Sequence, residues 1–364
     1  MNPNHIVSVD CIPLRLPFHH WSPPPLFAGK PRNKIDSALV RLVTKDGVVA
    51  WGESYCAEPD ALMAVFEALI SPLVQGKDAS APELLTNLQR TLHNLGRSGP
   101  IVHALAGLDI ALWDLRAKRE KVPLYVLLGG KQRSKIRAYA SLLQYYSNAE
   151  LIQMVATRAL QEGYTEIKLH ERTTTALAAA RKAAGPEIPI MVDTNCAWLP
   201  SEALAIIDEM KQYDPFWIEE PLWPPEDHIA LKHLKNKCNV RLAVGENASS
   251  TFALKQLIVD DAVDYVQPSI IKIGISASLA ISRECNSKVK CAPQVAYFGP
   301  GFLASLHLIA SLDYEVALER LYVDLSHIPY AQTVPLVNGW IDVPDSPGLG
   351  ADPEPDLAQG RYAK

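Results

Sequence analysis

The chain has 364 residues, of which 48% are hydrophobic and 21% charged, and its formal net charge is −5. This composition is typical of an ordinary soluble protein, and the length suits a barrel with a second, smaller domain. The sequence has no basic stripe for nucleic acid, no apolar run of the roughly 20 residues that a membrane span needs, and no secretory signal at its start. We therefore expect a cytoplasmic protein without nucleic-acid or membrane partners. The six cysteines show no paired spacing, which argues against a disulfide scaffold or a zinc site.

Residues 1–130 predict an α+β domain. Residues 5–57 read as strands, and the turn Lys45-Asp46-Gly47 between two β-rich runs is a strong hairpin signal. Apolar residues then recur at helical spacing. We expect an antiparallel sheet with helices packed on it. The predicted helices lie around 60–75, 82–95 and 100–120.

Residues 131–327 change to a rhythm of strand and helix, which indicates a parallel barrel of the TIM type. Residues 328–364 are rich in Pro and Gly and have no helical period, so we expect an irregular tail that folds back over the first domain. The eight candidate strands are 136–141, 165–170, 188–193, 216–219, 241–245, 263–267, 289–293 and 316–319.

Three acidic residues end consecutive candidate strands: Asp193 in IMVDTN, Glu219 in FWIEEP and Glu246 in LAVGEN. They lie 26 and 27 residues apart, which is the length of one strand, one helix and two loops. Consecutive strand ends of such a barrel open into one mouth, so the three carboxylates should converge there. Converging oxygen ligands attract Mg²⁺, which keeps coordination positions for water or an anionic substrate. The pattern predicts a magnesium site that handles a small-molecule carboxylate.

Removal of a proton next to a carboxylate requires a base and a way to neutralise the enolate charge. Lys168 and His170 alternate to the same face of the second strand. An irregular loop with His20 and Trp21 could close over the mouth from the first domain, although a solvated turn is the alternative. Glu220 should point to the other strand face, and Asp109, Trp113 and Asp114 should pack and cap at the domain junction. Other candidates at the rim are Lys272, Gln294, Tyr297 and Glu319.

These residues resemble the enolase superfamily, in the mandelate racemase and muconate lactonizing group. WIEEP, VGEN, KIG and LER occur in the family's order and spacing, and the likeness extends from the hairpin VRLVTKDGVVAWGE to the tail VNGWIDVPDSPGLG. The resemblance implies a capping α+β domain over a modified (β/α)7β barrel. It also implies Mg²⁺ held by Asp193, Glu219 and Glu246, and a homo-oligomer.

The resemblance also implies roles for single residues. Lys168 matches the first lysine of the family's K-x-K pair, which supports the substrate carboxylate. His170 replaces the second lysine and becomes the candidate base, with an ordinary pKa near neutrality. Ser141, Asn195 and Glu319 match positions that contact the substrate carboxylate or hydroxyl, and a protonated Glu319 could donate a hydrogen bond to the enolate.

The chain departs from the family where mandelate racemase and the sugar-acid dehydratases carry an Asp-His dyad. Ser269 and Gln294 occupy those two places. Lys272 stands where the muconate lactonizing and dipeptide epimerase branches keep a base on the opposite face. No single activity therefore transfers unchanged.

Several interpretations stay open at this point. Dehydration of a hydroxy acid or sugar acid ranks first because it needs one base. Racemisation or epimerisation by His170 and Lys272 follows, and cycloisomerisation comes third. His170 could instead be a structural histidine bonded to a loop carbonyl, and Lys272 a salt-bridge partner. A catalytically silent relative that binds a metal and a carboxylate is the alternative from a different class.

Overall fold

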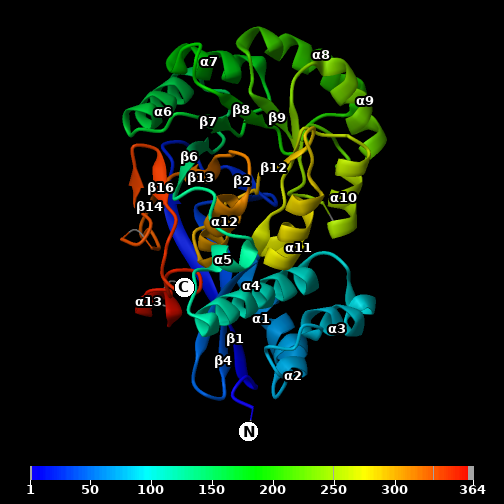
Figure 1. Ribbon diagram of the computed structural model, residues 1–364. Coiled ribbons are helices and arrows are strands. Elements are labelled where there is room, and N and C mark those ends of the chain that lie inside the picture. Colours follow the sequence, from blue (N-terminus) through cyan, green and yellow to red (C-terminus); the bar gives the residue numbers. More distant parts are fainter. Residues whose placement is uncertain (1, 249, 331, 360–364) are drawn as a thin grey trace.

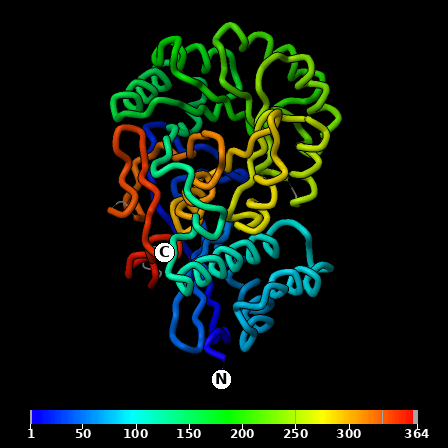
Figure 2. The backbone as a smooth tube through the Cα atoms, in the orientation of Figure 1, coloured from blue at the N-terminus to red at the C-terminus, as the bar shows by residue number. Residues whose placement is uncertain are grey.

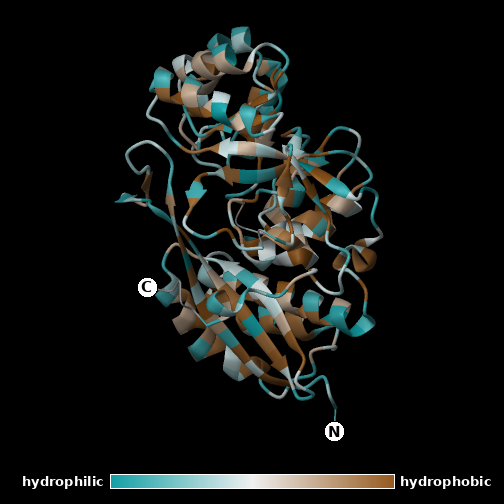
Figure 3. Ribbon diagram, turned by 90° about the vertical axis from the view of Figure 1, so that its left-hand side faces the viewer, coloured by the Kyte–Doolittle hydropathy of each residue, from teal (hydrophilic) through white to brown (hydrophobic). Residues whose placement is uncertain are grey.

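The computed structural model describes residues 2–248, 250–330 and 332–359. Figure 1 shows the N-terminal sheet and helices at the bottom of the view and the strand–helix alternation above them, with the C-terminal segment running down one side. Hydrophobic residues dominate the sheet strands in Figure 3, and hydrophilic residues are frequent on the outer helices at the top. None of the helices in the described ranges is long and apolar enough to cross a membrane.

The first domain is built on an antiparallel sheet in the order β14-β1-β4-β5. The predicted turn joins β4 to β5, with Gly47 at φ 84° and its N–H donating to the Thr44 carbonyl at 2.9 Å. A small hairpin, β2–β3, leaves the sheet between β1 and β4. The bounds are β1 Ile6–His19, β2 Leu26–Phe27, β3 Lys30–Pro31, β4 Lys34–Thr44, β5 Val49–Tyr55 and β14 Asp324–Leu325.

Helix α4 lies directly on β5 because two glycines remove the side chains that would separate them. A Cβ on Gly107 of α4 would sit 2.1 Å from Ser54 Oγ, and one on Gly52 of β5 would sit 2.0 Å from the Gly107 carbonyl oxygen. The close approach buries the sheet face against the helix. The helical segments of this region are α1 Pro59–Val65, η1 Phe66–Ile70, α2 Ser71–Val74, α3 Leu84–Thr91, η2 His93–Leu95, α4 Pro100–Glu120 and α5 Leu124–Leu128.

Eight parallel strands and seven intervening helices form the second domain, as the sequence predicted. The strands follow one another in chain order from β6 to β12, and β13 pairs with the far side of β6. The strands are β6 Lys135–Leu142, β7 Ile167–Leu169, β8 Ile190–Asp193, β9 Trp217–Glu219, β10 Leu242–Val244, β11 Tyr265–Val266, β12 Lys290–Cys291 and β13 Leu318–Tyr322. The helices are α6 Ala149–Gln161, α7 Thr174–Ala184, α8 Pro200–Met210, α9 His228–Cys238, α10 Thr251–Val259, α11 Ile270–Glu284 and α12 Pro300–Ser311, with the short η3 Lys211–Tyr213 after α8.

This arrangement confirms the predicted (β/α)7β barrel with an α+β capping domain. The described residues show no backbone ladder between β12 and β13. A side chain bridges the gap instead, because the Val295 N–H donates to Glu319 Oε2 at 2.9 Å. The barrel is therefore tied at its last seam by a residue of the mouth.

The two domains meet where α4 packs against α11. Asp109 of α4 accepts hydrogen bonds from the backbone N–H and the hydroxyl of Ser276, at 2.7 and 2.6 Å, and Trp113 Nε1 donates to the same hydroxyl at 2.9 Å. Helix α11 breaks at Gly274 (φ 87°), where a Cβ would meet Asp109 Oδ2 at 2.5 Å. Asp109 and Trp113 thus join the domains.

The C-terminal tail contacts both domains (Figure 2). Its first part was expected on the capping domain, but β16 pairs antiparallel with the start of barrel strand β6. Its later part does reach the capping domain: the Leu349 N–H donates to Asp114 at 2.9 Å, and Leu357 packs in a cluster with Leu14 and Leu16 of β1. The elements are β15 Leu336–Val337, β16 Trp340–Asp342 and α13 Pro355–Ala358.

Candidate active site

Lys168 lies at the centre of a buried cluster of carboxylates inside the barrel. Its Nζ is 2.7 Å from Glu219 Oε1, 2.7 Å from Glu319 Oε1 and 3.3 Å from Asp193 Oδ2. The lysine and the two glutamates have no exposed surface. Register explains the meeting, because Asp193 of β8 lies beside Glu219 of β9 and Lys168 is on the strand before them. The barrel thus gathers four ionisable groups from strands that are distant in sequence.

The charges of this cluster fix the protonation of Lys168. Burial alone would lower the pKa of its amine, but the negative charges of Glu219 and Glu319 outweigh burial and raise that pKa well above its ordinary value. Asp193 behaves in the opposite sense. Burial would raise the pKa of Asp193, yet the charges of Lys168 and His170 bring it below its usual range. Lys168 is therefore a permanent cation and not a base at neutral pH.

His170 stands beside this cluster with its two ring nitrogens in different surroundings. Nδ1 is 2.7 Å from the Leu142 carbonyl oxygen, and Nε2 is 3.3 Å from Asp193 Oδ2. A carbonyl only accepts, so Nδ1 carries the proton of that contact, and in the neutral ring Nε2 is left as the basic atom. Burial lowers the pKa of His170, but the charge and hydrogen bond of Asp193 more than compensate and raise it above its ordinary value. His170 is thus held on both sides in this arrangement, by the carbonyl at the end of β6 through Nδ1 and by the Asp193 carboxylate through Nε2, and the raised pKa favours the doubly protonated ring.

Glu319 differs from the expectation that it could act as a protonated donor. It accepts from the Ser141 hydroxyl at 2.8 Å and from the Val295 N–H at 2.9 Å, besides its contact with Lys168. Burial raises the pKa of Glu319, but Lys168 and these donors lower it below its usual value. Glu319 is an anion in this arrangement, and the structure does not support it as a hydrogen-bond donor to an enolate. Ser141 is fully buried and positions Glu319.

Glu246 and Lys272 meet at the other side of the mouth. Lys272 Nζ donates to the backbone carbonyl of Glu246 at 2.9 Å and lies 4.7 Å from the ring centre of Tyr55 of the capping domain. Within the described ranges Lys272 makes no ion pair, so the alternative of a structural salt bridge is not supported. Glu246 is partly buried, and its Oε1 accepts from Asn247 Nδ2 at 3.4 Å. Both side chains thus face the region between the two domains.

Glu220 does not follow the strand alternation that predicted it on the outer face. Its φ of 43° ends the strand, and its buried carboxylate accepts from the Gly245 N–H at 2.8 Å and from Cys196 Sγ at 3.5 Å. Burial, with the charge of Glu246, raises the pKa of Glu220 to about 7. Glu220 therefore links the ends of neighbouring strands.

Three predicted substrate-binding residues lie on loops of the mouth, with different surroundings. Asn195 donates its backbone N–H to Asp193 Oδ1 at 3.0 Å, and its side-chain amide contacts the same oxygen. The backbones of Gln294 and Ser269 form an isolated parallel β-bridge between adjacent strand ends, at the two positions where the family's Asp-His dyad would stand. The Tyr297 hydroxyl is buried and donates to the Gln294 carbonyl at 3.1 Å. Asn195 thus faces the site, whereas Tyr297 braces its loop.

The loop before β2 reaches the mouth and carries the two residues that the sequence suggested. His20 is buried, 3.3 Å from the Gln144 carbonyl oxygen, and Trp21 packs against Tyr322 and under the Arg158 guanidinium, 4.3 Å from its ring centre. The loop turns at Trp21 with φ 64°. Both side chains make packing contacts here, and their assignment as substrate-binding residues stays a prediction.

A small cavity of about 80 Å³ connects this loop to the strand ends. His170, Asp193 and Asn195 line it from the barrel, and Phe27 and Arg32 line it from the capping domain. Sequence reasoning missed Arg32, Tyr55 and Arg172. The irregular segment expected near the mouth, His19 to Trp21 followed by PPPLFAGK, ends at Lys30, two residues before Arg32. The full lining is Pro25, Leu26, Phe27, Arg32, Leu143, Gln144, His170, Arg172, Asp193, Thr194 and Asn195.

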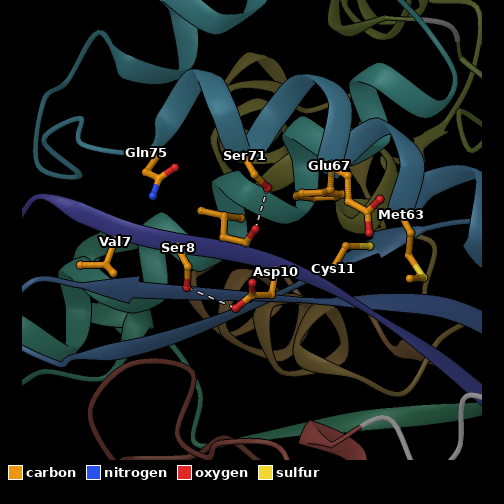
Figure 4. Close-up of a pocket in the computed structure, with 10 residues that line it drawn as sticks. Val7, Ser8, Asp10, Cys11, Met63, Glu67, Ser71 and Gln75 are labelled. Atoms are coloured by element: carbon orange, nitrogen blue, oxygen red, sulfur yellow. Dashed lines mark hydrogen bonds between the residues drawn. The ribbon is translucent and has the colours of Figure 1, made fainter.

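A larger hollow of about 340 Å³ lies on the capping domain, between β1 and the segment from α1 to α2 (Figure 4). Its polar groups bond among themselves: Ser8 Oγ donates to Asp10 at 3.2 Å and Ser71 Oγ donates to the Val9 carbonyl at 2.6 Å. Burial raises the pKa of the Cys11 thiol to about 12, so it is not a thiolate at neutral pH. This hollow offers no convergent acid and base, and the strand-end cavity is the candidate site.

The metal ligands suggested by the sequence fit a divalent ion in kind and in their placement on consecutive strands. Asp193, Glu219 and Glu246 follow consecutive strands and supply the oxygen ligands that Mg²⁺ prefers. In the present side-chain arrangement, no three acidic, histidine or cysteine groups of the described residues surround one point. Lys168 instead neutralises Asp193 and Glu219. Metal binding would therefore require side-chain movement, for which the partly buried Glu246 has room.

Comparison with known families matches nearly the whole chain. Residues 17–129 match the family described as the mandelate racemase / muconate lactonizing enzyme N-terminal domain, and residues 150–357 match the family described as enolase C-terminal domain-like. Members of this superfamily generally use Mg²⁺.

Characterised relatives fall into two reaction classes. The chain is 29% identical to D-galactarolactone cycloisomerase of Agrobacterium fabrum over 337 residues, which cover 86% of this chain and 88% of the relative. It is 28% identical to arabinonate dehydratase of Saccharolobus solfataricus over 340 residues, covering 88% and 89%. Among solved structures, 3,6-anhydro-D-galactonate cycloisomerase from Zobellia galactanivorans superposes with a TM-score of 0.83 at 26% identity and covers 98% of this chain and 99% of that chain. The similar enzymes are thus lyases and isomerases.

Proposed function

Because the chain belongs to the enolase superfamily, in the mandelate racemase and muconate lactonizing group, we propose that it is a Mg²⁺-dependent enzyme that removes the proton α to the carboxylate of a hydroxy acid. Dehydration of a sugar acid is the reaction that we favour. Arabinonate dehydratase is among its relatives, and this elimination needs one base. Asp193, Glu219 and Glu246 would hold the ion, which would supply positive charge to the substrate carboxylate.

The observation that carries the proposal is the orientation of His170. Its contact with the Leu142 carbonyl keeps a proton on Nδ1, so Nε2 at the cavity wall would be the basic atom of the neutral ring if Asp193 turned to a metal ion. A base fixed in this way can take a proton from a substrate in the cavity and later return it to the departing hydroxyl group, which leaves as water. The same imidazole could therefore serve both steps of a β-elimination.

Lys168 and Asn195 would assist in different ways. Lys168 brings a positive charge to the buried carboxylate cluster and would offset part of the negative charge that gathers there with a bound substrate. Asn195 holds Asp193 through its backbone N–H and borders the cavity. Together they would orient the acid with its α-carbon toward His170.

A cycloisomerase is the second candidate, because D-galactarolactone cycloisomerase is also among the relatives.

Racemisation would need a second base, for which Lys272 is the candidate. Its amine is held by the Glu246 carbonyl and lies over Tyr55, at the face of the mouth formed with the capping domain. Two-base chemistry predicts that Lys272→Ala abolishes α-proton exchange at one face only.

The test is a screen of sugar acids, hydroxy acids and lactones with the protein and Mg²⁺ in D2O, followed by NMR. A keto acid product would support the dehydratase, whereas an isomeric lactone product would favour the cycloisomerase. Deuterium at the α-carbon without a new product would indicate racemisation or epimerisation. Binding of an acid without any exchange would contradict the proposal and support a silent relative.

Glu219→Gln should eliminate turnover because it removes a proposed metal ligand with almost no change of volume. Glu53→Gln is the matched control, since Glu53 is also a fully buried carboxyl but contacts Ser37 and Gly301 at the domain junction. Retained exchange in Glu219→Gln would refute the metal-dependent mechanism. Equal loss in both variants would show a stability effect instead.

A further inference from the structure

Arg32 is a cation of the capping domain that faces the candidate cavity without an acidic partner. It follows β3, is partly buried, and lines the same cavity as His170 and Asp193. In the described ranges its guanidinium makes no ion pair or side-chain hydrogen bond. The guanidinium lies over the Phe27 ring, 5.1 Å from the ring centre. A guanidinium in such a place has unused donors directed at whatever fills the cavity.

Two of the nearby carboxylates are already engaged with other cations. Asp36 lies 3.8 Å from Arg15 and 3.7 Å from Lys34, and Asp193 contacts Lys168. Burial lowers the pKa of Arg32 and outweighs the charges of Asp36, Glu246 and Glu319, which act in the opposite sense and show that the guanidinium lies within electrostatic reach of the barrel mouth. Arg32 remains a cation because the ordinary pKa of arginine is far above neutrality.

The cavity lining carries a second guanidinium group besides that of Arg32. Arg172 follows His170 by two residues and borders the cavity, and the described residues show no ion pair for it. Asp193 is the only carboxylate among the described lining residues, against the two guanidinium groups of Arg32 and Arg172. Arg172 is exposed to solvent, but a neutral polyol would leave the partly buried Arg32 without a counter-charge, whereas an anion would pair with it.

The hairpin that carries Arg32 is held in place over the cavity. The Arg32 backbone N–H donates to the Pro25 carbonyl at 2.7 Å, and the Tyr146 hydroxyl of the barrel donates to the Pro24 carbonyl at 2.9 Å. Lys30 on the outer side pairs with Glu58 at 2.7 Å. The β2–β3 hairpin thus presents Arg32 from a braced position, which lowers the cost of ordering it around a ligand.

We propose that Arg32, assisted by Arg172, binds a second carboxylate at the far end of the substrate, so that the preferred substrate is a hydroxylated dicarboxylic acid. This inference rests on the proposed function and specifies the substrate of the same site. One carboxylate would lie at the Lys168 and metal-ligand end, and the other at the two arginines. Guanidinium groups bind carboxylates through paired N–H donors, which gives both charge and direction.

The test compares a sugar diacid with the monoacid of the same configuration, in which the distal carboxylate is a CH2OH group. Steady-state turnover and α-deuterium exchange are measured with Mg²⁺ for the wild-type protein, Arg32→Gln and Arg32→Lys. A charge-assisted hydrogen-bond pair predicts about a 10- to 100-fold higher kcat/KM for the diacid in the wild type. Arg32→Gln should remove this preference, mainly through KM, and Arg32→Lys should restore part of it.

Lys30→Gln is the matched control, because it removes a positive charge from the same hairpin but outside the cavity. Its preference for the diacid should equal that of the wild type. Equal turnover of the two acids, or an unchanged preference in Arg32→Gln, would overturn the inference while leaving the proposed enolisation intact. A stronger preference for a terminal phosphate ester over the diacid would also overturn it. Absence of exchange with every acid would instead count against the proposed function.

Discussion

The buried amine of Lys168 is the single group on which the charge balance of the barrel interior depends. Three carboxylates lie within 3.3 Å of it, and the cluster has almost no exposed surface. Lys168→Met would leave those carboxylates without their cation. We expect the free energy of unfolding to fall by about 3–5 kcal/mol, as measured by urea titration in EDTA.

Lys30→Met supplies the comparison, because Lys30 pairs with Glu58 at the surface. Exposed pairs are screened by solvent, so no measurable change is expected there. Unfolding curves of Lys168→Met that coincide with the wild type would show that the carboxylates take up protons or solvent at no cost.

Glu53 should make stability depend on pH, because burial raises the pKa of its carboxyl to about 7 in the folded protein from an ordinary value of 4.5. The folded state then binds more protons than the unfolded state between these two values. The contribution of Glu53 to the free energy of unfolding is fully present below pH 4.5, decreases as pH rises, and is lost above pH 7. The total loss is on the order of 3 kcal/mol.

The measurement is the difference in unfolding free energy between the wild type and Glu53→Gln from pH 4.5 to 8. The variant keeps an amide of the same shape near Ser37 and Gly301. The wild type should lose stability relative to the variant as pH rises. A constant difference across this range would contradict the raised pKa.

The sequence allowed us to predict which residues lie at strand ends, and these residues come together because a parallel barrel gathers its strand ends at one mouth. The same logic failed where backbone conformation changes, as at Glu220, whose positive φ breaks the alternation on which its orientation was predicted. It says nothing about His20 and Trp21, because sequence alone does not show which side of an irregular loop faces the mouth. Arg32, which does face it, lies about ten residues further along the chain.

Gly274 determines how α11 meets α4. Its φ of 87° and ψ of 169° are nearly those of Gly185 (76° and 177°), but only Gly274 has a neighbour at the Cβ position, namely Asp109. Alanine at either site should cost about 1–3 kcal/mol through backbone strain. Gly274→Ala should cost about 1–3 kcal/mol more, because Asp109 is fixed by two hydrogen bonds from Ser276 and cannot move away freely.

Thermal or urea unfolding of the two variants gives the comparison directly. Equal destabilisation would mean that the contact with Asp109 relaxes without cost and that α11 is not anchored by it.

The elements themselves followed closely from periodicity and turn chemistry. Each of the eight candidate barrel strands overlaps an observed strand, from β6 to β13. The tail was harder, since β16 is a three-residue strand whose place is set by pairing with β6 and not by its own sequence pattern. Short strands of this kind gain their stability from the partner, so local sequence carries little information about them.

At the scale of the whole molecule, the candidate site is a joint product of the two domains. The barrel supplies the carboxylates and His170, and the capping domain supplies Arg32 and Tyr55. Contacts between α4 and α11 and the returning tail hold the two parts together. These separate roles follow from the fold, because the strand ends of the barrel position the reacting groups, while loops of the capping domain would enclose the substrate.

The most direct test of this account is the rate of deuterium incorporation at the α-carbon of a sugar diacid in D2O. The protein is first stripped with EDTA and then given Mg²⁺, alongside His170→Gln under the same conditions. We predict no exchange without the metal, exchange after Mg²⁺ is restored, and a loss of about 100-fold or more in the variant. Exchange that survives EDTA, or that is unaffected in His170→Gln, would contradict α-proton abstraction by His170 at a magnesium-bound carboxylate.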